Sequence, residues 1–320
     1  MIALAHAPLL SRLQQRLLIL SIVAAVIAYL AFSFWTGWRD VSAAIRRIGL
    51  AGLLVALSLV LTNYVLRFVR WQSYLSVLGQ RVPAPTSLGI YLAGFALTTT
   101  PGKVGETTRS LLLEPLGVGY PASLAAFFSE RLSDLICVLL ITAVGMSVYQ
   151  PAQPLVLAIL LGVIAALWTV RQKALLERWQ ALLLQKRGKL ARIGGHAVQV
   201  LLDSRRCHEP ALLARATLLG IAGWGAEACA FYYSLHLLGS DISWQWACFI
   251  YTFSILVGVV SFLPGGLGSS EAVMIGLLVL KGMPHAEALA VTVFTRLTTL
   301  WFAVALGLLC LSVMSGRARR

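Results

Sequence analysis

The chain has 320 residues, of which 59% are hydrophobic and 12% are charged, and its mean hydropathy is +0.84. Because a soluble domain carries about 25% charged residues, this composition excludes an ordinary soluble protein and indicates a polytopic α-helical membrane protein. The formal charge of +14 does not indicate a nucleic-acid-binding protein, because the basic residues cluster at the termini and in residues 171–210, as in the cytoplasmic loops of membrane proteins.

The first two apolar runs, residues 17–36 and 50–69, are long enough to span a membrane, which takes about 20 residues. The first is too long for the core of a signal peptide, so we expect it to remain as a span. Arg67 and Arg70 lie near the end of the second run and share a helix face. We predict that this pair attracts phosphate at the mouth of a site; the alternative is that both side chains snorkel to lipid headgroups.

Residues 86–116 are apolar, then interrupted, then apolar again. The interruption is Thr-Thr-Thr-Pro-Gly-Lys-Val-Gly-Glu at residues 98–106. Each arm is short for a full crossing, so we predict a re-entrant helical hairpin with its tip near Pro101. In lipid, such irregular backbone is tolerated only where protein or water covers it.

Residues 121–149 are predicted to form one long helix that carries Glu130, Arg131 and Asp134, and residues 152–170 form another span. Residues 171–210 contain nine Lys and Arg against three acidic residues. Apolar residues at helical spacing in this region predict an interfacial amphipathic helix on the cytoplasmic side. The alternative is a solvated connector between two halves of the chain.

The second half repeats the pattern of the first. Residues 211–238 form a predicted span with Glu227, and the apolar run 243–263 leads into Pro-Gly-Gly-Leu-Gly-Ser-Ser-Glu at residues 264–271. Residues 271–281 form the returning arm, and residues 286–314 form the last span. Arg296 follows Glu271 as Arg131 follows Glu106 (131 − 106 = 25 and 296 − 271 = 25). Paired, Gly/Pro-interrupted apolar segments in two halves of a chain are typical of transporter sites near the middle of the membrane.

We therefore predict an all-α polytopic membrane protein with about six full spans, two re-entrant hairpins and an inverted internal repeat. Residues 1–170 form the first membrane repeat, residues 171–210 a basic cytoplasmic amphipathic connector, and residues 211–320 the second repeat. Both termini are then cytoplasmic, and the hairpins enter from opposite sides. Three arginines in a predicted outside loop, Arg39, Arg46 and Arg47, count against this topology, and eight spans are the alternative.

Ionisable groups in the apolar segments indicate a functional interior, because each costs at least about 2.5–3.5 kcal/mol at the membrane centre. We expect a hydrated cavity with ion pairs such as Glu106–Arg131 and Glu271–Arg296. Free N–H groups of helices that begin after the Pro-Gly breaks favour an anion there. The predicted phosphate-binding residues are Lys103, Arg109, Arg131, Arg296, Gly102, Gly105, Gly265, Gly266 and Gly268. The predicted charge-balancing or proton-coupling residues are Glu106, Glu130, Asp134, Glu227 and Glu271. The alternative is that these groups only fix helix packing.

The sequence contains no recognisable catalytic pattern. The five cysteines are scattered without a Cys-x-x-Cys pair, and no ligand cluster for a metal, no nucleotide loop and no Ser-His-Asp arrangement is apparent. We therefore predict neither an enzyme nor a bound cofactor or metal.

The motifs together resemble the lysylphosphatidylglycerol synthase transmembrane-region family, also called the flippase-like domain family. The segments that carry the resemblance are residues 63–71, 101–106, 130–134 and 264–271, with Arg296 downstream. In fused members, this region is joined to a soluble aminoacyltransferase domain and moves aminoacylated phosphatidylglycerol across the inner membrane. Because this chain ends at Arg320, directly after the last predicted span, the resemblance implies lipid movement without lipid synthesis.

The predicted function is that of a multi-pass translocase in the bacterial cytoplasmic (inner) membrane. Its substrate would be a phosphate-bearing phospholipid or a polyprenyl-phosphate-linked lipid, which moves through a polar cavity between inverted repeats. One alternative is a non-transporting scaffold that docks a separately encoded lipid-modifying enzyme or glycosyltransferase on residues 171–210. A transporter of small ions or solutes is a further alternative.

Overall fold

The computed structural model describes residues 38–145, 149–186 and 188–317, and the side chains of residues 38–41, 101–104 and 315–317 lie outside the described part. The first predicted span, residues 17–36, is also outside it. The described ranges contain helices and no strand, which confirms the predicted all-α class.

The element bounds are as follows. The α-helices are α2 (Trp38–Val77), α3 (Ala84–Gly94), α4 (Arg109–Leu113), α5 (Tyr120–Gly145), α6 (Gln153–Arg171), α7 (Lys173–Leu184), α8 (Lys189–Ser204), α9 (Pro210–Leu237), α10 (Trp244–Val260), α11 (Ser269–Leu280), α12 (His285–Arg296) and α13 (Phe302–Arg317). The 3₁₀ segments are η1 (Phe95–Leu97), η2 (Pro101–Thr108), η3 (Glu114–Leu116), η4 (Gln150–Ala152), η5 (Arg205–His208) and η6 (Pro264–Gly266). A π-helical segment, η7 (Leu297–Trp301), joins α12 to α13.

Within the described ranges, three helices are long and apolar enough to cross a membrane, namely Ser42–Val77, Gln150–Arg171 and His285–Met314. Shorter apolar helices cover Ala84–Leu97, Trp244–Val260 and Pro264–Leu280. The helices α5 and α9 have 26 and 28 residues, and both carry buried ionisable side chains in their middle turns. The chain is therefore a multi-helix membrane protein.

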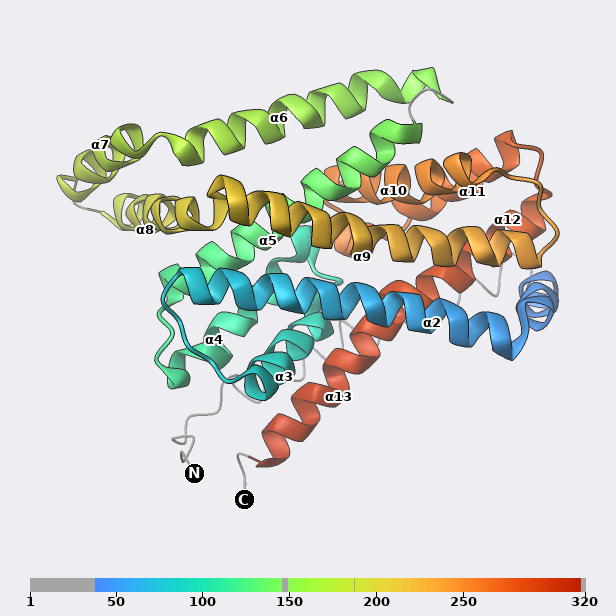
Figure 1. The fold of residues 1–320 in the computed structure, drawn as a ribbon, viewed down its shortest axis with the longest axis horizontal. Coiled ribbons are helices and arrows are strands. Elements are labelled where there is room, and N and C mark those ends of the chain that lie inside the picture. The colour runs from blue at the N-terminus through green and yellow to red at the C-terminus, as the bar shows by residue number, and fades with distance from the viewer. Residues whose placement is uncertain (1–37, 146–148, 187, 318–320) are drawn as a thin grey trace.

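Helices from the two halves of the chain pack against each other along their lengths. The long helices α2 and α9 lie side by side and run in opposite directions (Figure 1), and α5 packs against both α9 and α10. A Cβ atom on Gly220 of α9 would lie 2.3 Å from Cys137 Sγ and 2.7 Å from a guanidinium nitrogen of Arg70. Small residues at such crossings let membrane helices approach closely, so Gly220 allows α9 to pack tightly over α2 and α5.

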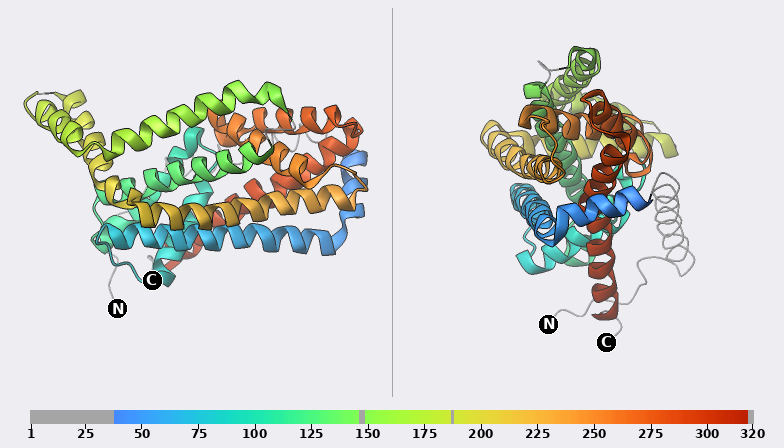
Figure 2. Two further views of the ribbon diagram at one scale, coloured as in Figure 1. Left: turned by 45° about the horizontal axis from the view of Figure 1, so that its top comes forward. Right: turned by 90° about the vertical axis from the view of Figure 1, so that its right-hand side faces the viewer.

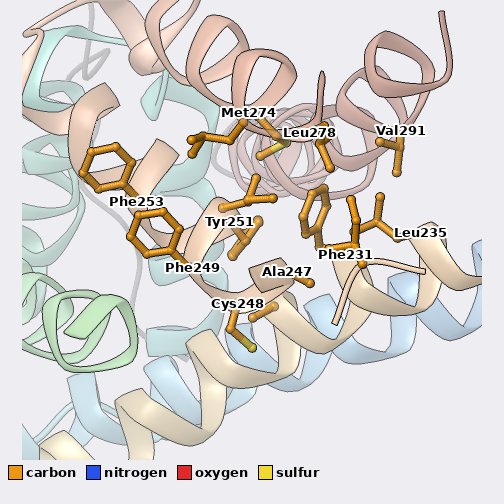
Figure 3. Packing of buried hydrophobic residues seen from close by; sticks show 14 of the residues in the cluster. Phe231, Leu235, Ala247, Cys248, Phe249, Tyr251, Phe253, Met274, Leu278 and Val291 are labelled. Carbon is orange, nitrogen blue, oxygen red and sulfur yellow. The ribbon is translucent and has the colours of Figure 1, made fainter. Parts of the chain in front are cut away.

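The largest apolar core lies mostly among the helices of the second half and also includes residues of α2, α5 and α6. Phe231 of α9 and the α10 residues Phe249, Tyr251 and Phe253 point into it (Figure 3), and Met274 of α11 covers them. The rings of Phe249 and Phe253 are stacked with their centroids 5.1 Å apart. Because lipid tails are as apolar as these side chains, close packing rather than water exclusion stabilises this core.

Each Pro-Gly break folds the chain back on itself, because α3 packs against α4 and α10 packs against α11. The two breaks, η2 and η6, also meet, and a Cβ on Gly265 would lie 3.4 Å from the Cα of Thr99. The expectation that an α-helix begins directly after each Pro-Gly is wrong for the first break. A 3₁₀ helix of eight residues follows Pro101 instead, and α4 has only five residues.

The two ends of the bundle differ in how their charges are arranged. At one end, the Arg47 guanidinium forms an ion pair of 2.9 Å with Glu287 and donates a hydrogen bond to the carbonyl of Leu238 at the end of α9. Arg47 therefore links the first part of α2 to the end of α9 and the start of α12. At the other end, the basic hairpin of α7 and α8 projects from the bundle (Figure 1, Figure 2) within the range 171–210.

Candidate functional site

Seven ionisable side chains from α2, η2, α4 and α5 meet inside the bundle, and we call them the first charged centre. Its members are Arg67, Arg70, Glu106, Arg109, Glu130, Arg131 and Asp134. Six of them are at most 6% exposed as residues, whereas 19% of the Arg131 side chain is accessible. Arg131 is thus the member that is most open to a ligand.

Glu130 lies at the middle of this centre. One carboxylate oxygen accepts hydrogen bonds from Arg67 at 3.1 Å and from the Tyr91 hydroxyl at 2.8 Å, and it lies 2.9 Å from Arg131. The other oxygen accepts a hydrogen bond from Arg109 at 2.7 Å. One buried carboxylate therefore pairs with arginines from α2, α4 and α5 and holds these elements together.

Asp134, one turn further along α5, is held in a similar way. It pairs with Arg70, with Arg131 at 3.1 Å and with Arg67 at 3.3 Å, and it accepts a hydrogen bond of 3.2 Å from the indole of Trp224. Arg67 and Arg70 are buried among these partners. The carboxylates of α5 thus draw both side chains into the bundle, so the predicted role of this pair at the mouth of a site would require it to leave these partners.

Arg109 is enclosed rather than open to a ligand. Its guanidinium donates a hydrogen bond of 2.6 Å to Glu106 and lies 4.3 Å from the ring centroid of Tyr91. A Cβ on Gly94 would come within 2.3 Å of its Nε, so α3 packs directly on it. The predicted pair Glu106–Arg131 is present at 3.8 Å, but Arg109 is the closer partner of Glu106.

A second charged centre, Glu271 and Arg296, lies beside the second break. Arg296 Nε donates to Glu271 at 2.5 Å, and its terminal nitrogen donates to the carbonyl of Gly265 at 2.8 Å. The other carboxylate oxygen of Glu271 accepts the backbone N–H of Gly268 at 2.7 Å. The predicted ion pair is present, and it ties α11 and α12 to the break.

Glu227 lies in the middle of α9. It is 5% exposed and accepts a hydrogen bond from the hydroxyl of Tyr251 on α10. Tyr64 of α2 donates in turn to the carbonyl of Thr299 at 2.8 Å, within the π-helical segment. These phenols link α9 and the last long helix to their neighbours in the bundle.

A cavity of about 340 Å³ lies between the two halves of the chain. Its polar lining consists of Thr100, Arg131, Asp134, Ser270 and Arg296, together with the backbone of Gly265 and Gly266. Its apolar lining includes Phe128, Leu132, Leu135 and Val138 of α5, Ala166 of α6, and Ile255, Leu256 and Val259 of α10. The cavity is thus amphiphilic, with an arginine from each half among its polar groups.

The structure separates the predicted phosphate-binding residues into two groups. Arg131, Arg296, Gly265 and Gly266 line the cavity, whereas Arg109 does not. Of the other glycines, Gly105 donates its N–H to Thr100 at 2.6 Å, and Gly268 is the N-cap residue of α11. Gly102 and Lys103 belong to residues 101–104, whose side chains lie outside the described part.

Sequence reasoning missed Tyr91, Thr100, Trp224 and Ser270. Thr100 and Ser270 lie next to the Pro-Gly breaks, and this position is the one feature of the sequence that could have identified them as site residues. Tyr91 and Trp224 lie within apolar helices, and nothing in the sequence distinguishes them from packing residues.

The charges of these described groups balance. Five arginines face five carboxylates: the arginines are Arg67, Arg70, Arg109, Arg131 and Arg296, and the carboxylates are Glu106, Glu130, Asp134, Glu227 and Glu271. Because the interior neutralises itself, an anion that enters the cavity competes with Glu130 and Asp134 for Arg131. It competes with Glu271 for Arg296. The two arginines can bind an anionic group such as phosphate, which suits guanidinium geometry.

The fold and the charged cavity define the class as a helical membrane protein with a polar site at the meeting point of two broken segments. The family model of the lysylphosphatidylglycerol synthase TM region matches residues 18–307. The chain belongs to this family.

The chain is also similar to archaeal membrane proteins. It is 23% identical to a UPF0104 membrane protein of Pyrococcus horikoshii, over 90% of this chain and 94% of the relative. It is 22% identical to a UPF0104 membrane protein of Methanothermobacter thermautotrophicus, over 93% of each. A shorter match to a protein of that name and organism has 32% identity and covers 31% of this chain and 30% of the relative.

Proposed function

We propose that the protein is a translocase for lipids that carry a phosphate group, such as a phospholipid or a polyprenyl-phosphate-linked lipid, in the cytoplasmic membrane. The observation that carries this proposal is the amphiphilic cavity, which joins Arg131 of one half to Arg296 of the other. The phosphate binds between the two guanidinium groups. The hydrocarbon chains follow the apolar lining of α5, α6 and α10 towards the bilayer.

The arrangement of the breaks supports an alternating mechanism. Both Pro-Gly breaks border the cavity through Thr100 and Gly265, and the helices on either side of each break fold back on one another. We infer that each fold is a re-entrant hairpin, that the hairpins enter from opposite sides, and that the two halves form an inverted repeat. Movement of one hairpin against the other exposes the cavity to each side in turn.

Binding requires an exchange of ion-pair partners. In the structure, Arg131 contacts Asp134 at 3.1 Å and Arg296 contacts Glu271 at 2.5 Å. The lipid phosphate replaces one or both carboxylates, and a released carboxylate then takes up a proton or a cation from the hydrated side of the cavity. This exchange keeps the interior neutral, because an unpaired charge at membrane depth is costly.

The test is transport of labelled phosphatidylglycerol and of a labelled short-chain prenyl phosphate in proteoliposomes. The variant R131Q/R296Q removes both guanidinium groups from the cavity, and we expect the transbilayer movement of the accepted lipid to fall at least tenfold. The matched control is R46Q, because Arg46 is exposed at an end of the bundle. Unchanged movement in R131Q/R296Q with a normal elution profile would contradict the proposal.

A further inference from the structure

The hairpin of α7 and α8 contains a second cavity, far from the breaks in the sequence. The two helices pack against each other, and the cleft between them has a volume of about 660 Å³. We propose that this cleft binds the headgroup of an anionic lipid at the membrane surface. The proposal does not rest on lipid transport, because none of the residues that line the cleft lines the central cavity.

The position of the hairpin places the cleft at headgroup depth. The apolar helix Gln150–Arg171 is long enough to span the membrane, and α7 begins at Lys173, two residues after its end. Figure 2 shows the hairpin projecting beyond the end of the bundle where α6 ends and α9 begins. A hairpin that leaves a span so abruptly meets the interface between hydrocarbon and water.

The exposed apolar side chains indicate that the hairpin contacts lipid. Leu184 and Leu190 are 77% and 85% exposed, and Leu182 and Ile193 are more than half exposed. Trp179 of α7 is also exposed, and tryptophan favours the membrane interface. Large apolar residues combined with many basic residues are the pattern of interfacial helices.

The cleft supplies groups that recognise an anion. Lys186, Arg192 and His196 line it together with Gln180 and Gln199. The side chains of Lys186 and Arg192 are exposed. Gln180 donates a hydrogen bond of 2.7 Å to Gln199, which donates one of 2.8 Å to Asp203, so one wall is held in place. A headgroup phosphate is expected to bind Lys186 and Arg192, both of which can donate several hydrogen bonds.

The cleft also has an apolar lining, at a place where α7 and α8 pack closely. A Cβ on Gly194 would lie 3.2 Å from the side chain of Leu183, so this glycine lets α7 and α8 approach closely. Leu183 itself lines the cleft. The cleft therefore has an apolar part as well as a basic rim, which suits a lipid better than a free anion.

The test is hydrogen exchange of the full chain in nanodiscs of phosphatidylcholine, with or without phosphatidylglycerol. We expect amides of residues 173–204 to exchange several-fold more slowly when phosphatidylglycerol is present. K186Q/R192Q should lose this difference. K173Q/R178Q should keep it, because this control removes the same charge from exposed positions of the same hairpin outside the cleft.

Three outcomes would overturn the proposal. The first is equal exchange in both kinds of nanodisc, and the second is an equal loss of protection in both double variants, which indicates general attraction to an anionic surface. The third is protection by soluble glycerol phosphate in phosphatidylcholine nanodiscs, which indicates a site for a free anion. Native mass spectrometry supplies an independent measure, because wild type should retain at least one more bound phosphatidylglycerol molecule than K186Q/R192Q, in which the central cavity is intact.

Discussion

The two charged centres share the same spacing of 25 residues between glutamate and arginine but have different surroundings. The position three residues after the glutamate is Arg109 in the first centre and Met274 in the second. The residue before the arginine is Glu130 in the first and Thr295 in the second. The first centre is thus a network that joins several elements, whereas the second is a single pair beside its break.

If the protein works as proposed, we expect the first centre to be the fixed part of the site and the second centre to be the part that moves. The ion pairs of Glu130 connect α2, α4 and α5. Arg296 instead holds its own break through the carbonyl of Gly265, and a π-helical segment follows directly at Leu297. Such segments are frequent at functional sites, so we expect the second half to rearrange around the first.

The largest expected effect comes from removing the central carboxylate of the network. Glu130→Gln leaves three arginines, Arg67, Arg109 and Arg131, without their common counter-charge. Breaking a buried ion pair costs about 3–5 kcal/mol, so we expect this variant to be largely unfolded or aggregated in detergent. Glu271→Gln removes one pair and should cost about 1.5–3 kcal/mol.

The melting temperatures of both variants are measured under the same conditions, with loss of the monomer peak in size-exclusion chromatography as the readout. The double variant Glu271→Gln/Arg296→Gln is the control, because it removes both members of a pair and leaves no unpaired charge. It should melt closer to wild type than Glu271→Gln does. Equal melting of Glu130→Gln and Glu271→Gln would show that the first centre has no special structural role.

The second prediction concerns the close packing of the second break. Gly266 has a φ of +66°, and a Cβ there would lie 3.0 Å from the Cα of Gly258 on α10. Gly266→Ala should therefore destabilise the protein by about 2 kcal/mol, since the left-handed conformation alone costs an L-residue about 1–2 kcal/mol. Gly276→Ala is the matched control, because a Cβ there meets nothing within 4 Å.

Gly276 lies within α11, where alanine is favoured over glycine, so Gly276→Ala should stabilise the protein by up to about 1 kcal/mol. Melting temperatures of the two variants separate a steric requirement at the break from a general effect of replacing glycine. If Gly266→Ala melts like wild type, the second break is looser than its backbone indicates.

The sequence predicted the helices more completely than the site. Apolar length located helices such as α6 and α9 to within a few residues, because this signal is local. The predicted run 50–69 instead lies well inside α2, and residues 171–210 contain the two helices α7 and α8 where one was predicted. The ion-pair partners of Arg67 and Arg70 lie more than 60 residues away on α5. Only the packing of α2 against α5 brings these groups together. From the sequence alone, two arginines that face the bundle interior therefore cannot be distinguished from two arginines that snorkel to headgroups.

The third prediction tests whether the second break stores strain. Phe262, two residues before Pro264, has a φ of +53° and is 73% exposed. A bulky side chain in this conformation costs about 1–2 kcal/mol, so Phe262→Gly should raise stability by about 1 kcal/mol. Leu263→Gly should lower it, because Leu263 has a φ of −69° and there is no strain to relieve. A lower melting temperature for Phe262→Gly would mean that contacts of the ring outweigh its strain.

The smallest expected effect lies outside both centres, at the end of the bundle that carries α7 and α8. Burial of His208 in η5 lowers the pKa of its ring below the usual value, although its Nδ1 lies 2.8 Å from the carbonyl of Ser204. The native ring therefore stays neutral at a pH where the ring of the unfolded chain, with a pKa of about 6.5, is already protonated. Stability should thus fall as the pH drops below about 6.5, because the unfolded state binds more protons.

His208→Gln should remove this part of the acid sensitivity, since glutamine carries no proton-binding ring. Melting temperatures between mildly acidic and neutral pH measure the effect, and the curve of the variant should be flatter than that of wild type. His196→Gln is the control for the loss of a histidine, because His196 is exposed on α8. Parallel curves for His208→Gln and wild type would show that His208 does not cause the acid sensitivity.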